Sequence, residues 1–343
     1  MITSKIARPV LVFLVLLLAF SSTSFAQKKK KKAAPTGTPV LWREPGDVSA
    51  RDLKFGPGAE HLAPVAPFTF VKEDPTGASP KFRVKDANGV SWTVKLGPEA
   101  QAETVATRLV WAMGYFAEES YYYDRVEVQN LPRLARGQEF VSGSIARGVR
   151  FEPRRSGVVR GAIWDWLKNP FVGTRELDGL KVLMVLLANY DTRLDNNRVL
   201  HRKHPETGEW EAHYVVTDIG ATLGKVGGLG GKRIKNSLPD FQASKFILSV
   251  ENGIVEFDYS TKPQGGGKFA SFFNPGYGKR QANKEKAMRR IPVENARWIG
   301  EMLSRLSDEQ IHDAFRAAGY DDATREGFVK ALRERISALA ALG

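Results

Sequence analysis

Residues 189–200 read Asn-Tyr-Asp-Thr-Arg-Leu-Asp-Asn-Asn-Arg-Val-Leu, a loop rich in acids and amides around which the rest of the chain is organised. The loop follows Leu180–Ala188, the most continuously apolar segment after residue 26. A segment that is apolar almost all round is typical of a helix at the centre of a packed domain. After the loop, a predicted β-hairpin returns the chain to Asp218-Ile219-Gly220. The sequence therefore places an acidic loop and a second aspartate at the ends of buried elements.

Three side chains in this region have the types that phosphoryl transfer requires. That reaction needs a carboxylate that orients the attacking hydroxyl, and an amide and a carboxylate that hold Mg²⁺. Asp191, Asn196 and Asp218 supply these groups in order along the chain. Taken singly, the loop is also compatible with a turn stabilised by Asx hydrogen bonds, and Asp218 with a plain strand end. Asp195, in the same loop, is expected to face water.

The first half of the chain predicts a small sheet. Phe68–Val71 is a short strand by its alternation and β-propensity, and residues 75–80 form a turn. Lys81–Lys85 and Val90–Leu96 flank Asn88-Gly89, a dipeptide that is the strongest short hairpin signal. A further strand is predicted at Val126–Leu131.

Lys95 lies near the end of the second hairpin strand, on the face opposite Trp92, Val94 and Leu96. After Gly97-Pro98 a helix is predicted. Glu103 borders the buried stripe of this helix, so it can lean toward the sheet. The stripe and the expected stop of the helix are formed by Ala102, Ala106, Leu109, Met113 and Gly114.

The second half is predicted to be mainly helical with one hairpin. The hairpin pairs Asn197–Leu200 with Glu211–Val216, and the glycine-rich residues Gly224–Gly231 are expected to be mobile. Three helices are predicted to close the chain. They are Val293–Leu306, a second helix opened by the capping box Ser307-Asp308-Glu309-Gln310, and a third with Phe328, Leu332, Ile336 and Leu339 on its buried face.

This order of elements predicts an α+β fold of two lobes with a cleft between them. The predicted boundaries are 61–135 for a small, β-rich N-lobe with one helix and 136–343 for a larger, mainly helical C-lobe. The chain has no cysteine, so its core must hold the fold without disulfides.

Residues 1–60 are predicted to lie outside the two lobes. Residues 1–26 combine a basic start, an apolar run too short to span a bilayer comfortably and small residues at Ser24 and Ala26, which is typical of a signal peptide cleaved near Ala26. We therefore expect export to a periplasm or the extracellular medium, and no transmembrane segment in the mature chain. Residues 27–60 are expected to form a Lys-rich disordered tether and an extended segment.

The formal net charge is +13, and the run Lys28–Lys32 supplies five of the positive charges. Such a run can attract an anionic envelope polymer, although a solvated tail without a specific partner is the favoured alternative. The folded part has no dense basic helix interleaved with aromatic residues, so nucleic acid is not expected as a partner.

Other residue patterns point to structure rather than to chemistry. His201, His204 and His213 lie on the two arms of one predicted hairpin and could meet at a metal ion. Because no cysteine or paired-glutamate signature accompanies them, exposed histidines are the favoured interpretation. Trp164 and Trp166 are expected in the core.

The loop and the hairpin resemble the catalytic core of protein-kinase-like folds. The local pattern is closest to phosphoinositide kinases and is more loosely similar to HipA-type and secretory-pathway kinases. In phosphoinositide kinases the catalytic loop is Asp-Arg-His-Asn-Asp-Asn, and a hairpin leads from it to Asp-Phe-Gly. Here the loop reads Asp191-Thr192-Arg193-Leu194-Asp195-Asn196, and the hairpin leads to Asp218-Ile219-Gly220. The resemblance covers roughly Phe68–Gly224.

The resemblance implies an ATP-dependent phosphotransferase of two-lobed, protein-kinase-like fold that uses Mg²⁺ or Mn²⁺. It would transfer a phosphoryl group to a hydroxyl of a protein, sugar or lipid. By position, Asp191 matches the catalytic aspartate that orients this hydroxyl, and Asn196 and Asp218 match the two metal ligands.

The resemblance also implies a nucleotide site in the first half of the chain. Lys95 resembles the strand lysine that grips the ATP phosphates, and Glu103 resembles the helix glutamate that pairs with it. The turn Thr76–Lys81 resembles the phosphate loop of HipA-type kinases, which makes Gly77 and Lys81 cofactor-binding candidates.

The chain departs from the family pattern at several positions. The loop lacks the usual histidine, Thr192 replaces an arginine, Ile219 replaces a phenylalanine, and the phosphate loop has one glycine. These departures leave the acceptor open and motivate a second hypothesis, an inactive, pseudokinase-like module that binds a nucleotide or another ligand. A third hypothesis is a basic, envelope-binding structural protein in which the loop only stabilises a turn.

Overall fold

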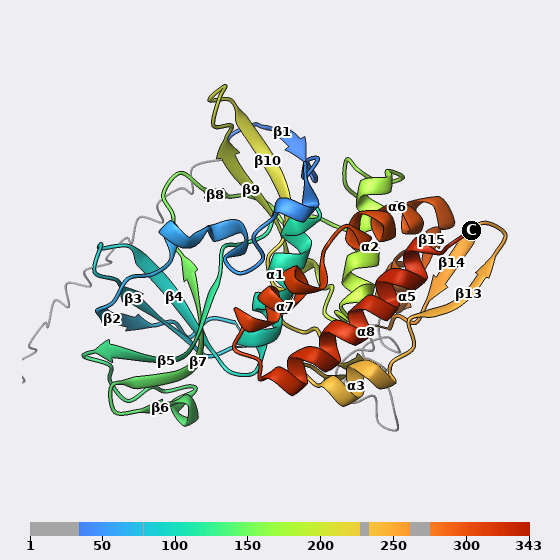
Figure 1. Cartoon of the computed structure of the whole chain (residues 1–343). Coiled ribbons are helices and arrows are strands. Elements are labelled where there is room, and N and C mark those ends of the chain that lie inside the picture. Colours follow the sequence, from blue (N-terminus) through green and yellow to red (C-terminus); the bar gives the residue numbers. More distant parts are fainter. Residues whose placement is uncertain (1–33, 78, 227–232, 261–274) are drawn as a thin grey trace, which may run out of the picture. The chain divides into compact units, whose positions relative to one another are not determined.

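The strands between residues 68 and 153 form one sheet that closes on itself (Figure 1). The computed structural model describes residues 34–77, 79–226, 233–260 and 275–343. The strand order is β4-β3-β2-β5-β7-β6, and β4 also pairs with β7. The strands are β2 (Phe68–Glu73), β3 (Lys81–Lys85), β4 (Ser91–Leu96), β5 (Tyr121–Gln129), β6 (Val141–Ser142) and β7 (Ile145–Pro153).

The pairing of β4 with β7 turns the sheet into a small barrel that is filled by side chains. Alternate residues of the strands form a buried hydrophobic cluster. The predicted hairpin is confirmed, with Lys81 opposite Lys95 and Lys85 opposite Ser91. At its turn, the indole Nε1 of Trp92 donates to Asp86 Oδ2 at 2.9 Å. The cluster includes Phe82, Val84, Trp92, Val94, Val149 and Phe151.

Helix α1 (Glu99–Ala112) follows β4 and packs against β7, β5 and α7. Its predicted stripe is confirmed, since Ala102, Ala106 and Leu109 are at most 1% exposed. The helix ends at Ala112, and the predicted stop, Gly114, has φ +86°. A Cβ at Gly114 would lie 2.2 Å from the carbonyl oxygen of Arg43.

Gly114→Ala is expected to destabilise the fold by about 1–3 kcal/mol, because alanine would meet both the backbone strain and the clash with Arg43. Gly143→Ala is the matched control, since Gly143 has φ +59° but open space around its Cβ position. Urea unfolding of both variants measures the difference. Equal losses of stability would contradict a role for the close contact with Arg43.

Residues 34–62 contribute to a second buried hydrophobic cluster, which is separate from that of the barrel. Strand β1 (Thr38–Val40) pairs in parallel with β10, and three short 3₁₀ turns follow. Leu41, Val48 and Leu53 are 1–2% exposed and belong to the cluster that contains α1 and the C-terminal helices. The turns are η1 (Val48–Ala50), η2 (Gly56–Gly58) and η3 (Glu60–Leu62).

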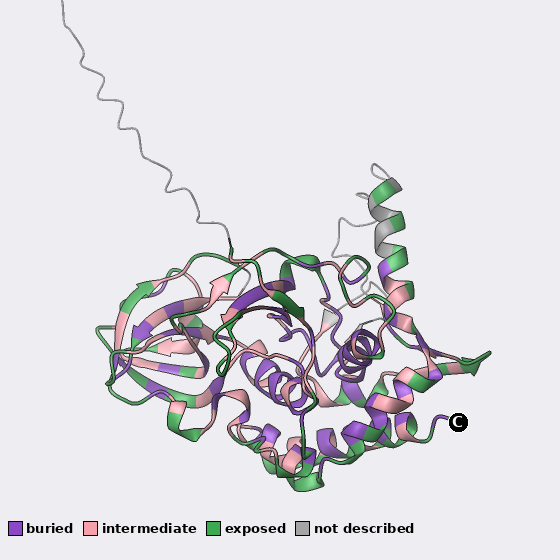
Figure 2. Cartoon of the chain, turned by 90° about the horizontal axis from the view of Figure 1, so that it is seen from above, coloured by how far each residue is buried: buried purple, intermediate pink, exposed green. Residues whose placement is uncertain are grey.

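Helix α2 (Arg175–Leu186) lies in this second cluster, with Leu177, Val182 and Leu183 at 0% exposure. Trp164 and Trp166 are buried as expected. The hairpin after the loop is confirmed, and β9 (Asn197–Lys203) and β10 (Trp210–Val216) pair antiparallel between β8 (Val159–Arg160) and β1. In Figure 2 the buried positions lie mainly in the central helices and strands, and the exposed ones lie on the loops and on the outer parts of helices and strands.

The three predicted C-terminal helices are confirmed as α6 (Val293–Ser304), α7 (Asp308–Arg316) and α8 (Asp322–Ala340). The capping box at Ser307 and Gln310 is present, and α6 packs against both α2 and α8. Further elements were not anticipated. They are β11 (Lys225–Val226), β12 (Arg233–Ile234), α3 (Leu238–Ala243), α5 (Pro275–Arg289) and a sheet of β13 (Ile247–Glu251), β14 (Ile254–Phe257) and β15 (Arg290–Pro292).

The chain is thus a mixed α+β protein with helices and several sheets in its described part. Within that part, no helix combines the length and the apolar character needed to cross a bilayer. The predicted signal peptide, the run Lys28–Lys32 and most of Gly224–Gly231 lie outside the described residues.

Candidate functional site

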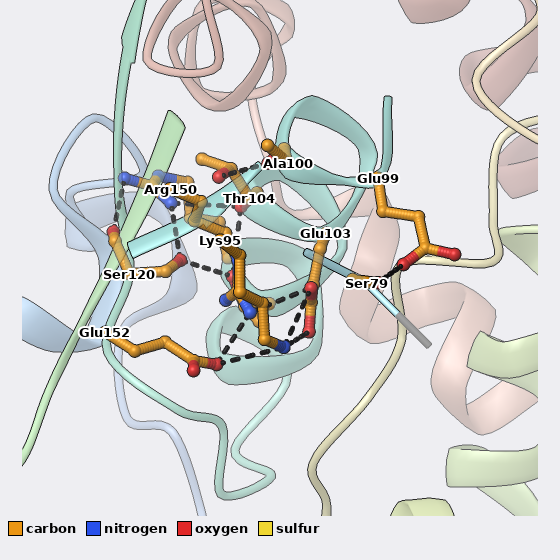
Figure 3. A network of polar contacts seen from close by, with 11 residues as sticks. Ser79, Lys95, Glu99, Ala100, Glu103, Thr104, Ser120, Arg150 and Glu152 are labelled. Carbon is orange, nitrogen blue, oxygen red and sulfur yellow. Dashed lines mark hydrogen bonds and ion pairs between the residues drawn. The ribbon is translucent and has the colours of Figure 1, made fainter. Parts of the chain in front are cut away.

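Lys95 on β4 and Glu103 on α1 meet, as the sequence predicts (Figure 3). The Lys95 Nζ lies 3.4 Å from each carboxylate oxygen of Glu103. The pair forms because β4 ends at Leu96 and the chain turns directly into α1 through Gly97, whose φ is +102°. The Glu103 side chain is only 2% exposed, so this carboxylate depends on nearby cations.

Two residues of β7, Arg150 and Glu152, complete a four-membered charge network with this pair (Figure 3). Arg150 Nη2 lies 2.8 Å from Glu103 Oε2 and 2.6 Å from Glu152 Oε1. Glu152 Oε1 is also 3.4 Å from Lys95 Nζ. Neither residue was predicted as part of the site, because no strand was predicted in this region. The alternation Val149-Arg150-Phe151-Glu152, with Val149 and Phe151 buried, was the signal for a strand.

Burial and charge act in opposite directions in this network. Burial of Lys95 opposes its charge, but Glu103 and Glu152 outweigh this and raise the pKa of Lys95 above its ordinary value. Burial raises the pKa of Glu103 against the charges of Arg150 and Lys95. For Glu152, the same two cations overcome burial and lower the pKa to about 2. Lys95 therefore carries its charge throughout the physiological pH range.

Lys81, Lys95 and Arg150 form a row of cations across three neighbouring strands. Lys81 faces Lys95 in the pairing of β3 with β4, and Lys95 faces Arg150 in the pairing of β4 with β7. Facing residues of paired strands project to the same side of the sheet, and like charges there destabilise the pairing. Binding of an anion at this row is therefore favourable. Glu103 and Glu152 neutralise only part of its positive charge.

The turn before β3 is fixed close to Lys81. Gly77 has φ +77°, and a Cβ there would lie 3.1 Å from Lys81 Nζ. Arg136 Nη1 donates to the carbonyl oxygens of Pro75 and Gly77 at 2.8 and 3.1 Å. Ser79 Oγ donates to Glu99 Oε2 at 2.6 Å, which ties the turn to the start of α1 (Figure 3). Burial lowers the pKa of Lys81, and the neighbouring Lys95 acts in the same direction.

Asp218 follows β10 and lies within electrostatic range of the row of cations. Its charge favours the charged forms of Lys81, Lys95 and Arg150. Gly220 makes this approach possible, because a Cβ there would lie 3.3 Å from Glu103 Oε2 and 3.0 Å from the Cβ of Glu99. The segment Asp218-Ile219-Gly220 is therefore packed against the start of α1, with Ile219 at 1% exposure.

Asn196 is held beside Asp218 by the register of the hairpin. Thr217 donates from its backbone N and from Oγ1 to the carbonyl oxygen of Asn196, at 2.7 and 3.2 Å. Asn196 Nδ2 donates to the carbonyl oxygen of Asp191 at 2.7 Å, which orients the amide. No hydrogen bond from the described residues engages Asn196 Oδ1, so this oxygen remains available as a ligand.

The Asp191 loop is stabilised from several sides. Asn189 Oδ1 accepts from the backbone N of Asp191 at 2.9 Å, so the Asx turn proposed as an alternative is present. Lys284 on α5, which was not predicted as part of the site, donates from Nζ to the carbonyl oxygen of Thr192 at 2.9 Å. The Asp191 carboxylate itself pairs with Arg193, at 2.7 Å to Nε and 3.0 Å to Nη2. Arg193 is also within range of the charges of Asp195 and Asp218.

The sequence-predicted residues thus fall into two connected groups. Gly77, Lys81, Lys95 and Glu103 meet on the barrel side, and Asp191 and Asn196 meet in the loop. Asp218 joins them, since it interacts with Lys95 and with Arg193. Asp195 is exposed, as expected.

A carboxylate oxygen of Asp218 and the amide oxygen of Asn196 are ligands that suit Mg²⁺. This ion usually keeps several waters and also binds phosphate oxygens. No group of three or more acidic, histidine or cysteine side chains in the described part of the chain could hold a metal by itself.

The expectation of exposed histidines is wrong for two of the three. His201 and His213 are 9% and 8% exposed, and the His213 ring stacks on Phe116 at 3.8 Å.

A cavity of about 310 Å³ lies next to this network and shares Glu152 with it. Thr93, two residues before Lys95 on β4, lies in its wall, opposite Glu152 in the strand pairing. The wall is strongly charged. Its charged residues are Glu118, Glu119, Glu152, Arg154, Arg155, Arg160 and Arg202.

Comparison with known proteins gives distant structural similarities. No family model matches the chain, and no curated protein matches it. The chain is similar to the crystal structure of CtkA, a proinflammatory kinase of Helicobacter pylori, at 12% identity over 81% of this chain and 97% of CtkA, with a TM-score of 0.47. It is also similar to the Golgi casein kinase, at 10% identity over 79% of this chain and 74% of that one, with a TM-score of 0.28. Both TM-scores lie below 0.5, so neither similarity assigns a fold family or an activity to the chain.

Proposed function

We propose that this chain is an ATP-dependent phosphotransferase with a protein-kinase-like fold. The observation that carries the proposal is the row Lys81, Lys95 and Arg150, with Asp218 within electrostatic range of it. A row of cations on one face is favourable when phosphates occupy it, and an adjacent carboxylate and amide suit the metal that accompanies a nucleotide.

In this proposal the fold has two lobes, the barrel and the mainly helical part, with the nucleotide between them. The two separate hydrophobic clusters support this division. Lys81 and Lys95 would hold the phosphates of ATP, and the cavity next to Glu152 would take the remainder of the nucleotide. Its volume of about 310 Å³ falls at the lower end of the range of about 300–1,000 Å³ for small-molecule sites.

Asn196 and Asp218 would hold Mg²⁺ or Mn²⁺, which neutralises phosphate charge when it is bound. Asp191 would accept a hydrogen bond from the hydroxyl of a protein, sugar or lipid acceptor and orient it for attack. Asn196 supports this assignment, because its side chain bonds the Asp191 carbonyl and so couples the metal position to the loop. Lys284 and Asn189 would keep the loop in place.

The second candidate is an inactive nucleotide-binding module. It is favoured by the ion pair of Asp191 with Arg193, which occupies both carboxylate oxygens. Orientation of a hydroxyl by Asp191 requires one of these bonds to be given up. Because Arg193 is 61% exposed, this rearrangement costs about 1 kcal/mol or less. The pair therefore does not exclude catalysis.

We further propose export of the chain through residues 1–26, and attraction of an anionic envelope polymer by Lys28–Lys32. The composition of these segments supports both parts of the proposal.

Transfer of label from γ-labelled ATP tests the proposed function. With Mg²⁺ or Mn²⁺, the wild type is expected to transfer label to itself or to an acceptor in an envelope extract. Lys95→Met is expected to lower this transfer by roughly 10²-fold or more, because the phosphates lose their central cation. Lys85→Met, at an exposed position of β3, is the control and is expected to behave as wild type. Nucleotide binding without any turnover would instead support the inactive module.

A further inference from the structure

Lys95 is held by two carboxylates that come from different elements. Its Nζ lies 3.4 Å from Glu103 on α1 and 3.4 Å from Glu152 on β7. Neither acid is closer than the other, so the amine is shared between the helix and the sheet (Figure 3). A lysine ammonium has three N–H donors. One donor shared by the two oxygens of Glu103 and one directed at Glu152 would leave the third for a phosphate oxygen.

Arg150 is the counter-cation that allows the two acids to stand together. Its Nη2 bridges Glu103 and Glu152, and its side chain is 0% exposed. The network contains two cations and two anions, so its formal charge is zero. Without Arg150, two buried carboxylates would compete for one lysine, and one of them would be protonated more readily.

The strand register explains how the Glu152 carboxylate reaches the Lys95 amine. Arg150 faces Lys95 directly, and Glu152 lies two residues further along β7, on the same side of the sheet and opposite Thr93. Glu152 thus fixes the Lys95 amine relative to the barrel, whereas Glu103 fixes it relative to α1. Two restraints from two directions define the position of a flexible side chain better than one.

We propose that Glu152 is a second positioning residue for Lys95, equivalent in effect to Glu103, with Arg150 as the cation that bridges both acids. The proposal rests on the proposed function, because the Lys95 amine is positioned for a nucleotide phosphate. Loss of either acid leaves Lys95 with one partner, and loss of both leaves a buried lysine without a partner.

Affinity for ATP-Mg tests this redundancy. Glu152→Gln and Glu103→Gln are each expected to weaken binding of a fluorescent ATP analogue with Mg²⁺ by roughly 3- to 10-fold, the size expected for one partly buried ion pair. The double variant is expected to lose more than the product of the two single effects, because the acids replace one another. Glu139→Gln, at an exposed position, is the control. Unchanged affinity of Glu152→Gln, with a weakened Glu103→Gln, would overturn the proposal.

The pH profile separates positioning from a structural role. Because the pKa of Lys95 is raised, Lys95 stays charged between pH 7 and pH 10 in the wild type. Its titration is therefore expected to leave the affinity for ATP-Mg unchanged over this range. In the double variant burial and the charge of Arg150 both lower the pKa of Lys95, and of the carboxylates that raised it Asp218 remains. Binding should therefore weaken as the pH rises through this range. A level profile in the double variant would contradict the proposal.

A measurement without nucleotide keeps this test independent of the proposed function. Acetic anhydride acetylates only deprotonated amines, so the rate at Lys95 relative to that at the exposed Lys85, measured by peptide mass spectrometry, reports the state of Lys95. The ratio is expected to rise several-fold in Glu152→Gln and further in the double variant. If the wild type binds no ATP but the ratio rises, the proposed function fails and the positioning role stands. If ATP binds and the ratio does not change, the positioning role fails alone.

Discussion

Arg150→Met is expected to lower the free energy of unfolding by about 3–5 kcal/mol, the loss that follows when one partner of a buried ion pair is removed. Arg150 is fully buried, and it contacts Glu103 and Glu152 at 2.8 and 2.6 Å. Methionine has a similar length but no charge, so Glu103, at 2% exposure, would keep only the more distant Lys95. Unfolding in urea, followed by circular dichroism, measures the loss.

Two further variants show whether the charge network causes this loss. Arg125→Met changes an exposed arginine of β5 and is expected to alter the stability by less than about 0.5 kcal/mol. Adding Glu103→Gln to Arg150→Met removes the buried carboxylate that has lost its contact with Arg150. The double variant is therefore expected to regain part of the stability. A loss below about 1 kcal/mol in Arg150→Met would show that Lys95 alone satisfies both acids.

Asp191→Asn is expected to lower the turnover number by roughly 10²–10⁴-fold and to leave the affinity for ATP-Mg close to that of the wild type. The range is that of a group which handles the proton of the attacking hydroxyl. Asparagine keeps the shape of the side chain, and the loop is held independently through the Asp191 backbone by Asn189 and Asn196. Initial rates of label transfer and equilibrium binding of the nucleotide separate the two effects.

Asp195→Asn is the matched control, because Asp195 lies in the same loop and is exposed. Its rate is expected to stay within a factor of two or so of the wild type. Equal losses of activity in both variants would indicate that the loop as a whole, and not the Asp191 carboxylate, supports transfer. Full activity of Asp191→Asn would remove the assigned role.

Local signals in the sequence located much of the fold and of the candidate site. Asn88-Gly89 located the hairpin that carries Lys95, and the apolar run before residue 189 located α2. The pairing of Lys95 with Glu103 was predicted from the resemblance to kinase-like folds, and it joins a strand and a helix that are separated by only two residues, Gly97 and Pro98. Each of these relations depends on residues that are close in the sequence.

Relations between distant segments were not predictable in the same way. The closure of the barrel depends on the pairing of β4 with β7, which are separated by more than forty residues, so Arg150 and Glu152 could not be placed next to Lys95. Leu41, Val48 and Leu53 are isolated apolar residues in a segment rich in proline and glycine, and only tertiary packing buries them. Lys284 reaches the loop from a helix that lies ninety-two residues further along the chain.

One omission was avoidable. Strands β13 and β14 are joined by Asn252-Gly253, with φ values of 51° and 72°, and this dipeptide is the same hairpin signal that located β3 and β4. The first strand, Ile247–Glu251, has no buried residue, whereas intermediate and buried positions alternate along Ile254–Phe257.

The closed barrel also affects how the chain can be completed during synthesis. Strand β2 pairs in parallel with β5, with Phe68 opposite Val128. Strand β4 can pair on its second side only after β7 has been synthesised, because Val94 pairs with Phe151. Until Pro153 has left the ribosome, two strands carry backbone amides and carbonyls without partners, and such edges are open to association with other chains. A nascent or truncated chain that stops before residue 145 is therefore the form most in need of a chaperone.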